Sequence, residues 1–275
     1  MTVINTNVKS LIAANALKVN GRAMANAMEQ LSTGRRINSA ADDAAGLAVS
    51  QDMTAQIRGL NMAVRNANDG ISMAQTAEGA LIEVSNMLQR MRELAVQAST
   101  GTLSSTQRGY LDDEFQALND QIQNTVTNTK WNGISVLGSS VMTSSGGIDI
   151  QVGTDSGQTI SVVGASLTDI ATSNFSGGIT SASAASGMLS TLDDALVAVN
   201  TARASLGAVV NQLTSAADNL TNVSQNLSES RSRVLDTDYA AATTELARTQ
   251  IIQQAGMAVL AQANQQPQTV LALLR

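Results

Sequence analysis

The chain has 275 residues, of which 43% are hydrophobic but only 2% are aromatic. Aromatic side chains bury the most area per residue, so a chain with so few of them is poorly suited to a thick, round core. Rows of Ala, Leu, Val and Met suit narrow seams between helices instead. The net charge of −6 argues against a nucleic-acid-binding protein, because such a protein needs an excess of Lys and Arg to neutralise phosphates.

The chain contains no Cys and no His. Disulfides, thiolate metal sites, cysteine nucleophiles and histidine bases are therefore excluded. Three acidic pairs, at residues 42–43, 112–113 and 193–194, lie near predicted helix starts, where the helix dipole favours carboxylates. We therefore expect no catalytic residue, no metal and no cofactor. The sequence predicts neither a membrane-spanning helix nor a Sec signal peptide, which taken alone favours a cytosolic protein.

The first third of the chain predicts two helices separated by a break. From about Ile4 to Leu31 apolar residues recur at helical spacing, and Gly34 is a typical stop just past a helix. Residues 39–42 (SAAD) resemble a capping box that opens the next helix. That helix carries an apolar seam at 3–4 spacing from Gly46 to Ala98, broken only by Gln56. At about 1.5 Å per residue it would be roughly 80 Å long.

The middle of the chain predicts a short helix and a β-hairpin. Apolar residues at helical spacing run from Leu111 to Ile122, and residues 131–185 are rich in Gly, Ser and Thr. Within that region Ile148–Val152 alternates apolar and polar residues, and Thr159–Val162 does the same. The turn-rich segment 153–157 lies between them, so the two stretches are expected to pair.

A second long seam and a final helix complete the chain. The seam runs from Leu189 to Val234 at 3–4 spacing. Three polar side chains interrupt it: Arg203, Ser224 and Arg231. Residues 234–238 offer a break and new N-cap residues before a helix that includes Leu246–Leu274. Pro267, the one proline, is expected to kink this helix or end it locally.

This layout predicts a mainly α fold: an elongated antiparallel helical bundle or coiled coil with a small β-hairpin region in the middle of the chain. The apolar residues of the two terminal helices spread over more than one narrow stripe. A pair of such helices buries too little area to be stable alone, so the terminal helices either fold when partners cover them or fold back onto their own bundle. The periodicity favours neither reading. A head-to-tail contact that does not close into a ring would produce a helical filament.

Several motifs resemble those of one family. Residues 31–47, LSTGRRINSAADDAAGL, closely resemble the linker motif of bacterial flagellins. Further matching stretches are 56–61 (QIRGLN), 65–72 (RNANDGIS), 75–81 (QTAEGAL), 230–234 (SRSRV), 236–239 (DTDY), 253–256 (QQAG) and 259–275. The resemblance covers roughly residues 1–160 and 187–275, in the family's order. It implies a structural subunit that self-assembles into the helical flagellar filament used for swimming.

The resemblance also implies a domain organisation. In flagellins the paired terminal helices form an inner tube, D0, the long helices and the hairpin form an outer tube, D1, and spoke linkers connect them. The corresponding segments are 1–33 (N-terminal D0 helix), 34–46 (spoke), 47–186 (N-terminal D1 helices and hairpin), 187–234 (C-terminal D1 helix), 235–240 (spoke) and 241–275 (C-terminal D0 helix). Because only a short segment separates the hairpin from the returning helix, the chain resembles a minimal flagellin that has D0 and D1 only.

Candidate site residues follow from these segments. The expected D0 assembly interface consists of Ile4, Val8, Leu11, Leu17, Met24, Met28, Leu31, Leu246, Ile252, Val259, Leu260, Leu271 and Leu274. The expected spoke residues are Gly34, Arg35, Arg36, Asn38, Asp42 and Asp43. Residues 89–97 resemble the patch that a vertebrate Toll-like receptor reads on flagellins, and that patch would comprise Gln89, Arg90, Leu94 and Glu114. Residues 270–274 resemble the end that cytosolic immune receptors recognise.

Localisation and partners are also implied by the resemblance. Flagellins leave the cell through a type III flagellar export apparatus without a cleaved signal, so the chain is expected to be extracellular, in the filament. The expected partners are further copies of the chain, an export chaperone that engages residues 246–274, and the filament cap and hook–filament junction proteins. No nucleic-acid binding and no membrane insertion are expected.

Three other readings compete with the filament subunit. A hook–filament junction protein shares the terminal helices, but its motifs are usually weaker than those found here. A surface flagellin homologue that binds polysaccharide would require a direct binding assay to detect. An enzyme would require an inserted catalytic domain, and the middle of the chain is too short to hold one.

Overall fold

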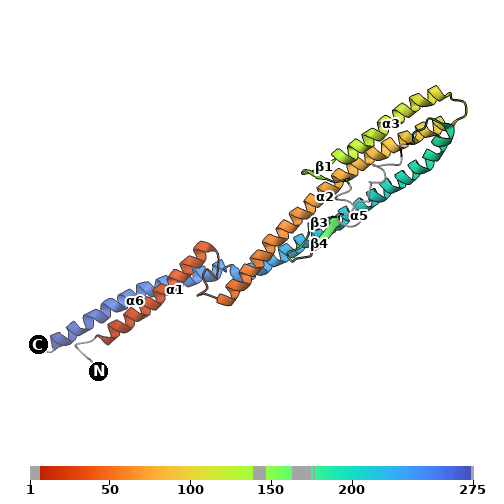
Figure 1. The fold of residues 1–275 in the computed structure, drawn as a ribbon. Coiled ribbons are helices and arrows are strands. Elements are labelled where there is room, and N and C mark those ends of the chain that lie inside the picture. The colour runs from red at the N-terminus through yellow and green to blue at the C-terminus, as the bar shows by residue number, and fades with distance from the viewer. Residues whose placement is uncertain (1–6, 139–146, 163–174, 176, 274–275) are drawn as a thin grey trace. The chain divides into compact units, whose positions relative to one another are not determined.

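The computed structural model describes residues 7–138, 147–162, 175 and 177–273, and these are mostly helical (Figure 1). The helices are α1 (Val8–Thr33), α2 (Ala44–Ser99), α3 (Ser105–Asn128), α5 (Ala182–Leu235) and α6 (Tyr239–Leu273). The strands are β1 (Lys130–Trp131), β2 (Ile134–Ser135), β3 (Ile148–Gln151) and β4 (Thr159–Val162). The predicted mainly α class and the hairpin within residues 148–162 are confirmed. No helix among the described residues is both long and apolar enough to span a bilayer.

The chain divides into two compact units. Unit 1 comprises residues 1–55 and 226–275, and unit 2 comprises residues 56–225. The division falls inside α2 and α5. It lies about ten residues after the linker at 34–46 and about ten residues before the linker at 235–240. The linkers therefore belong wholly to unit 1, together with the first turns of α2 and the last turns of α5.

In unit 1, α1 and α6 lie side by side and antiparallel (Figure 1). Near the start of α1, Asn7 donates to the Ala263 carbonyl oxygen at 2.8 Å. Further along, Asn20 donates to the Thr249 carbonyl oxygen at 2.7 Å, so residue numbers fall on α6 as they rise on α1. The α1 residues of this seam recur at 3–4 spacing: Ser10, Ala13, Leu17, Asn20, Met24, Ala27 and Leu31. Those of α6 include Ala242, Leu246, Thr249, Gly256, Leu260 and Ala263.

In unit 2, α2, α3 and α5 pack along one another (Figure 1). Ser224 of α5 donates to the Asn61 side chain at 3.1 Å, which satisfies a polar residue on the α5 seam. Towards the other end, Arg92 of α2 pairs with Asp193 at 2.7 Å, so α2 and α5 are antiparallel. The capping box of α3, formed by Ser104 and Gln107, fixes where that helix starts.

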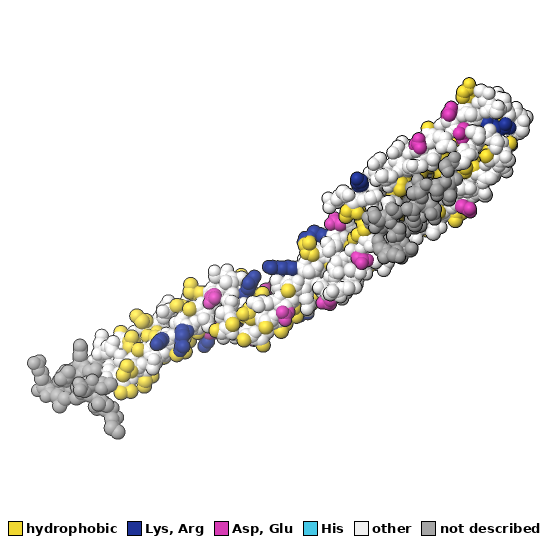
Figure 2. Space-filling model, in the orientation of Figure 1, with side chains coloured by type: hydrophobic (Ala, Val, Ile, Leu, Met, Phe, Trp, Pro, Cys, Tyr) yellow, Lys and Arg dark blue, Asp and Glu magenta, His cyan; other side chains and the backbone are white. Residues whose placement is uncertain are grey.

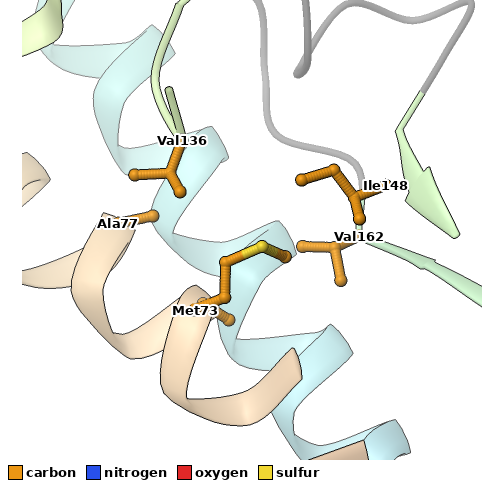
Figure 3. Close-up of a pocket in the computed structure, with 6 residues that line it drawn as sticks. Met73, Ala77, Val136, Ile148 and Val162 are labelled. Atoms are coloured by element: carbon orange, nitrogen blue, oxygen red, sulfur yellow. The ribbon is translucent and has the colours of Figure 1, made fainter. Parts of the chain in front are cut away.

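The core of unit 2 is a continuous row of apolar residues along α2 and α5. Its largest members include Leu81, Leu88, Leu192 and Leu206, all fully buried. The two β-hairpins cover α2: Figure 3 shows Val136, Ile148 and Val162 converging on Met73 and Ala77. A hairpin alone is marginal in water, and this packing supplies the apolar cover that it lacks.

The seam predicted along α2 is correct from Leu60 onward but wrong before it. Val49 is 46% exposed and Gln56 is exposed, whereas Ser50 and Ile57 are buried. The stripe that faces the neighbouring elements therefore shifts by one residue near Ile57. An α-helix has 3.6 residues per turn and drifts out of a strict 3.5-residue repeat, so a register fitted to one end does not hold over the whole length.

Other local predictions also need correction. Asp43, not Ser39, caps α2, because its carboxylate accepts from the Gly46 N–H at 2.9 Å. Helix α6 continues through Pro267 to Leu273, so the proline does not end the helix. A proline removes one backbone donor from a helix, and the remaining turns of a 35-residue helix are sufficient to continue it.

Two of the acidic pairs do not lie at helix starts. Asp112 is in the second turn of α3 and accepts from the Ile179 N–H at 2.6 Å, which holds the segment before α5. Asp193 is in the fourth turn of α5 and pairs with Arg92. Among the described residues, no three carboxylates lie close enough together to hold a metal ion.

Candidate assembly surface

The seam between α1 and α6 buries only small side chains. The buried apolar residues of the two helices, within the described side chains, are Ala27, Ala242 and Ala263, and the fully buried Thr249 is polar. Leu17 approaches Gly256 so closely that an added Cβ there would lie 2.8 Å from the leucine side chain. Small residues let two helices approach closely, but they remove little apolar area from water.

The outer side of α1 exposes large apolar residues. Val8, Ile12 and Val19 recur at positions i, i+4 and i+11, about a third of a turn from the seam, and they are 50%, 64% and 57% exposed. Asn15 and Asn26 lie on the same side and are exposed as well, but they are polar, so the apolar stripe is confined to the first half of α1. This stripe is directed away from α6, so α6 of the same chain does not cover it.

Helix α6 exposes a stripe of its own on the side away from α1. It consists mainly of small residues around one large one: Ala240, Ala247, Ile251, Ala255 and Ala258. Ile251 is 66% exposed, and Ile252, Met257 and Val259 extend apolar character to further faces. Apolar residues thus reach the surface on more than one side of α6, between exposed polar side chains such as Arg248, Gln250 and Gln254. Figure 2 shows hydrophobic side chains reaching the surface over α1 and α6.

The two linkers of unit 1 are held together by backbone hydrogen bonds. Gly34 ends α1 with a positive φ of 70°, and its carbonyl accepts from the Thr237 N–H at 3.0 Å. The Arg36 N–H donates to the Leu235 carbonyl at 2.7 Å, and Arg35 forms a β-bridge with Asp236. The expected spoke residues are thus brought together as an ordered connection between two chain segments.

The remaining spoke residues order the turn before α2. The Asp42 carboxylate accepts from the backbone N–H groups of Ser39 at 2.9 Å and Asn38 at 3.1 Å. These bonds, followed by the one from the Ser39 hydroxyl, hold the pKa of Asp42 below its ordinary value. Ile37 in the same linker is buried and lies against Gly46. The linker is therefore fixed both by polar contacts and by one apolar anchor.

Comparison with known proteins identifies this architecture. The family model described as the bacterial flagellin N-terminal helical region matches residues 4–141, and the bacterial flagellin C-terminal helical region matches residues 189–274. The chain belongs to the bacterial flagellin family. It is a structural protein rather than an enzyme: a subunit that self-assembles into the helical, extracellular flagellar filament used for swimming.

Flagellins of similar size match the chain along its whole length. The flagellin of Halalkalibacterium halodurans is 45% identical over 275 residues, covering 99% of this chain and 100% of that one. The Bacillus subtilis flagellin is 40% identical over 302 residues, covering 99% of each. A crystal structure of Bacillus cereus flagellin is 31% identical, covers 57% of this chain and 88% of its own, and has a TM-score of 0.49. Flagellin B of Vibrio cholerae is 35% identical over an alignment of 375 positions, 100 more than this chain has. Beside that longer relative, the flagellin described here is a minimal form of the family.

The structure separates the expected D0 interface residues of this flagellin into two groups. Half-buried residues along the α1–α6 seam or its edges are Leu17, Met24, Leu31, Leu246 and Leu260, whereas Val8, Leu11, Met28, Ile252 and Val259 are exposed. Ile4 and Leu274, and the side chain of Leu271, lie outside what the structure describes. Ile12, Val19, Ile251 and Met257 were missed by sequence reasoning, although their position away from the seam could have shown them.

The expected receptor patch of the flagellin is only partly at the surface. Arg90 pairs with Glu114 and with Glu93, each at 2.9 Å, and Gln89 beside it is exposed. Leu94 is 1% exposed and belongs to the core of unit 2, so its side chain does not share that surface. Leu94 lies on the side of α2 that faces its packing partners, as Leu88 and Met91 do.

Proposed function

We propose that the exposed stripes of α1 and α6 are the surfaces that neighbouring subunits bury against one another in the filament. One observation carries this proposal: the α1–α6 pair exposes most of its large apolar side chains, whereas its buried apolar residues are alanines. Eleven of the eighteen exposed large hydrophobic residues in the described chain belong to this smaller unit. A helix pair with so little buried area is stabilised mainly by whatever covers its outer faces.

The domain assignment follows from the same reasoning. We propose that α1 and α6 form D0, within residues 1–33 and 241–275, and that residues 47–234 form D1. Residues 34–46 and 235–240 would be the spokes between them. The hydrogen-bonded pairing of the two linkers supports this reading, because a connection between two tubes must keep its geometry in every subunit.

The route out of the cell is proposed by analogy with the family. The chain would leave unfolded through the type III flagellar export apparatus, without a cleaved signal. A chaperone would cover residues 246–274 beforehand. The exposed apolar faces of α6 support this step, because uncovered faces of this kind would associate prematurely. The cap and hook–filament junction proteins would meet the same faces at the filament ends.

Recognition by vertebrate receptors is a further proposal. The exposed polar group of Gln89, Arg90 and Glu114 would be the part of the flagellin patch that a Toll-like receptor could reach. Leu94 would contribute only by supporting α2 from beneath. Residues 270–274 would be read only in a monomer whose end is free.

Substituting the α1 stripe tests the assembly proposal. In the triple variant V8S/I12S/V19S each replaced side chain loses about 1 kcal/mol or more of burial in the filament. The critical concentration for polymerisation should then rise about a hundredfold or more. The matched control is V96S/V197S/V223S, because these valines are 49%, 64% and 38% exposed on helices of unit 2.

Both variants would be polymerised in ammonium sulfate, which strengthens apolar burial. Critical concentration is read as the protein left in the supernatant after sedimentation, and electron microscopy checks for filaments. Loss of assembly in the α1 variant with a near-normal control supports the proposal. Equal effects of the two triple variants, or normal assembly of the α1 variant, would contradict it.

A further inference from the structure

A second surface, on unit 2, carries two arginines at the spacing of two helical turns. Arg58 and Arg65 lie seven residues apart on α2 and are exposed. Met62 lies between them on the same stripe, is 48% exposed, and contacts the Arg65 guanidinium. Neither arginine takes part in an ion pair within the described residues. The stripe is therefore an apolar side chain flanked by two available positive charges about 10 Å apart.

The complementary pattern occurs once on another helix of the same unit. Asp113 and Asp120 lie seven residues apart on α3, and both are exposed. Ala117 lies between them and is exposed as well. In the described helices of unit 2, these aspartates are the one carboxylate pair at this spacing, and the two arginines are the one basic pair. The two stripes thus match in charge and spacing, with a large residue opposite a small one.

The two stripes of one chain cannot meet each other. Glu114 of α3 lies beside Arg90 of α2, joined at 2.9 Å, and the two helices run antiparallel. Residues 113–120 therefore lie beside residues of α2 near position 87. The arginine stripe is about 25 residues nearer the start of α2, or about 40 Å away along the helix. Pairing of the two stripes with each other therefore requires a second molecule.

We propose that the Arg58–Met62–Arg65 stripe of one subunit docks on the Asp113–Ala117–Asp120 stripe of a neighbouring subunit. When neighbouring subunits are related by a screw axis nearly parallel to α2, α3 of one subunit lies antiparallel to α2 of the next. Arg58 then faces Asp120, and Arg65 faces Asp113. The contact joins two different surfaces with a stagger of about 40 Å, so it propagates along a helix and does not close a dimer.

A second copy is the occupant favoured by the structure. The chain polymerises, as its family does, and the matching acidic stripe is part of the chain itself. Exposed charge pairs contribute little affinity singly, but two pairs in register fix the stagger and disfavour other alignments. This contact lies in unit 2, so it is independent of the apolar stripes of unit 1. It goes beyond the proposed D0 interface.

Charge reversal with rescue tests the proposal. The variants are R58E/R65E, D113R/D120R and the combination of all four substitutions. The matched control is D194R/D218R, which makes the same charge change as D113R/D120R but at two exposed aspartates of α5. Each full-length monomer is added to fragments of its own filaments, prepared in ammonium sulfate, in buffer of about 0.1 M ionic strength, where charges act over about 10 Å. The concentration of monomer left at the plateau is measured by sedimentation.

Each double variant should raise the critical concentration on the order of tenfold, because two attractive pairs become repulsive. The fourfold variant should return to within about twofold to threefold of the unsubstituted chain, and the control should stay near it. Raising the salt to about 1 M should reduce the difference in critical concentration between the double variants and the unsubstituted chain, since the Debye length falls to about 3 Å.

Circular dichroism melting of the monomers verifies that unit 2 is folded. Assembly of both double variants at the original critical concentration would overturn the proposal, as would a folded fourfold variant that recovers nothing. Neither result would change the interpretation of the V8S/I12S/V19S experiment, which tests the apolar stripe of unit 1 separately.

Discussion

The turn at Gly34 offers a sharp test of how the linkers are held. The residue has a φ of 70°, in the left-handed region, and its N–H donates to the Gln30 carbonyl at 2.9 Å to close α1. An L-residue with a Cβ is disfavoured in this region, and only Asn tolerates it comparatively well. We therefore expect a graded series in which Gly34→Asn is mild, Gly34→Ala is harmful and Gly34→Val is worst.

The size of the effect follows from the surroundings of the residue. An added Cβ would lie 3.5 Å from the Tyr239 hydroxyl oxygen, an ordinary van der Waals distance, so no steric clash contributes. What remains is the backbone cost of the left-handed conformation, about 1–2 kcal/mol for Ala. A β-branched side chain adds further strain. The Ala variant should accordingly raise the critical concentration of assembly about fivefold to thirtyfold.

The assay compares the four chains by critical concentration and by the temperature at which their filaments dissociate. A near-normal Asn variant with the order Asn, Ala, Val in severity supports the backbone argument. If Ala and Val assemble as well as Asn, the left-handed turn is not required in the filament. If Asn is as harmful as Val, the glycine is required for lack of a side chain, and the reasoning from φ is refuted.

Two further predictions concern the core of unit 2 and the linker carboxylate. Phe115 is fully buried, and its ring meets that of Phe175 edge to face with centroids 6.4 Å apart. Phe115→Ala should therefore lower the free energy of unfolding in urea by about 3–5 kcal/mol, and Phe115→Leu by clearly less. Equal urea midpoints for the two variants and the unsubstituted chain would contradict this. The pKa of Asp42 is lower in the folded chain than in the unfolded one. Its contribution to folding stability is therefore complete above the ordinary pKa of about 4 and is lost as the pH falls through the lower folded pKa. Asp42→Asn should therefore lower thermal stability at neutral pH, and this difference should disappear as the pH falls through the lowered folded pKa of Asp42. A difference in stability that does not depend on pH would argue against a role of the charge.

The helices and most of the unit 2 core could be predicted from the sequence, because buried apolar residues there recur at 3–4 spacing over many turns. From Leu60 to Ala98 every predicted seam residue is buried. The register failed where Gln56 interrupted the pattern, and the interruption marked the error: Ile57, its neighbour, is the buried residue. The polar break at Gln56 thus marks a change of register, whereas Ser224 on the α5 seam is buried in register and donates to Asn61.

Short-range elements and surface patches were harder to predict. The β1–β2 hairpin was missed, although Asn132 and Gly133 both have positive φ, 47° and 81°, as a type I′ turn requires. Its strands have two residues each, too few for any alternation to be visible. Leu94 was grouped with the receptor patch by motif resemblance, which carries no information about which side of a helix faces the core.

The contrast between the two units explains why one seam could be predicted better than the other. Unit 2 places leucines, methionines and phenylalanines inside, so its periodicity reports its own packing. In unit 1 the α1–α6 pair buries alanines and a threonine and exposes Val8, Ile12 and Val19, so the apolar residues of these two helices indicate contacts with other molecules. The hydrophobic pattern of a helix reflects all the surfaces that cover it in the assembled protein, including those of other subunits. In a subunit of a polymer, an apolar residue that the monomer leaves exposed therefore indicates where the next subunit binds.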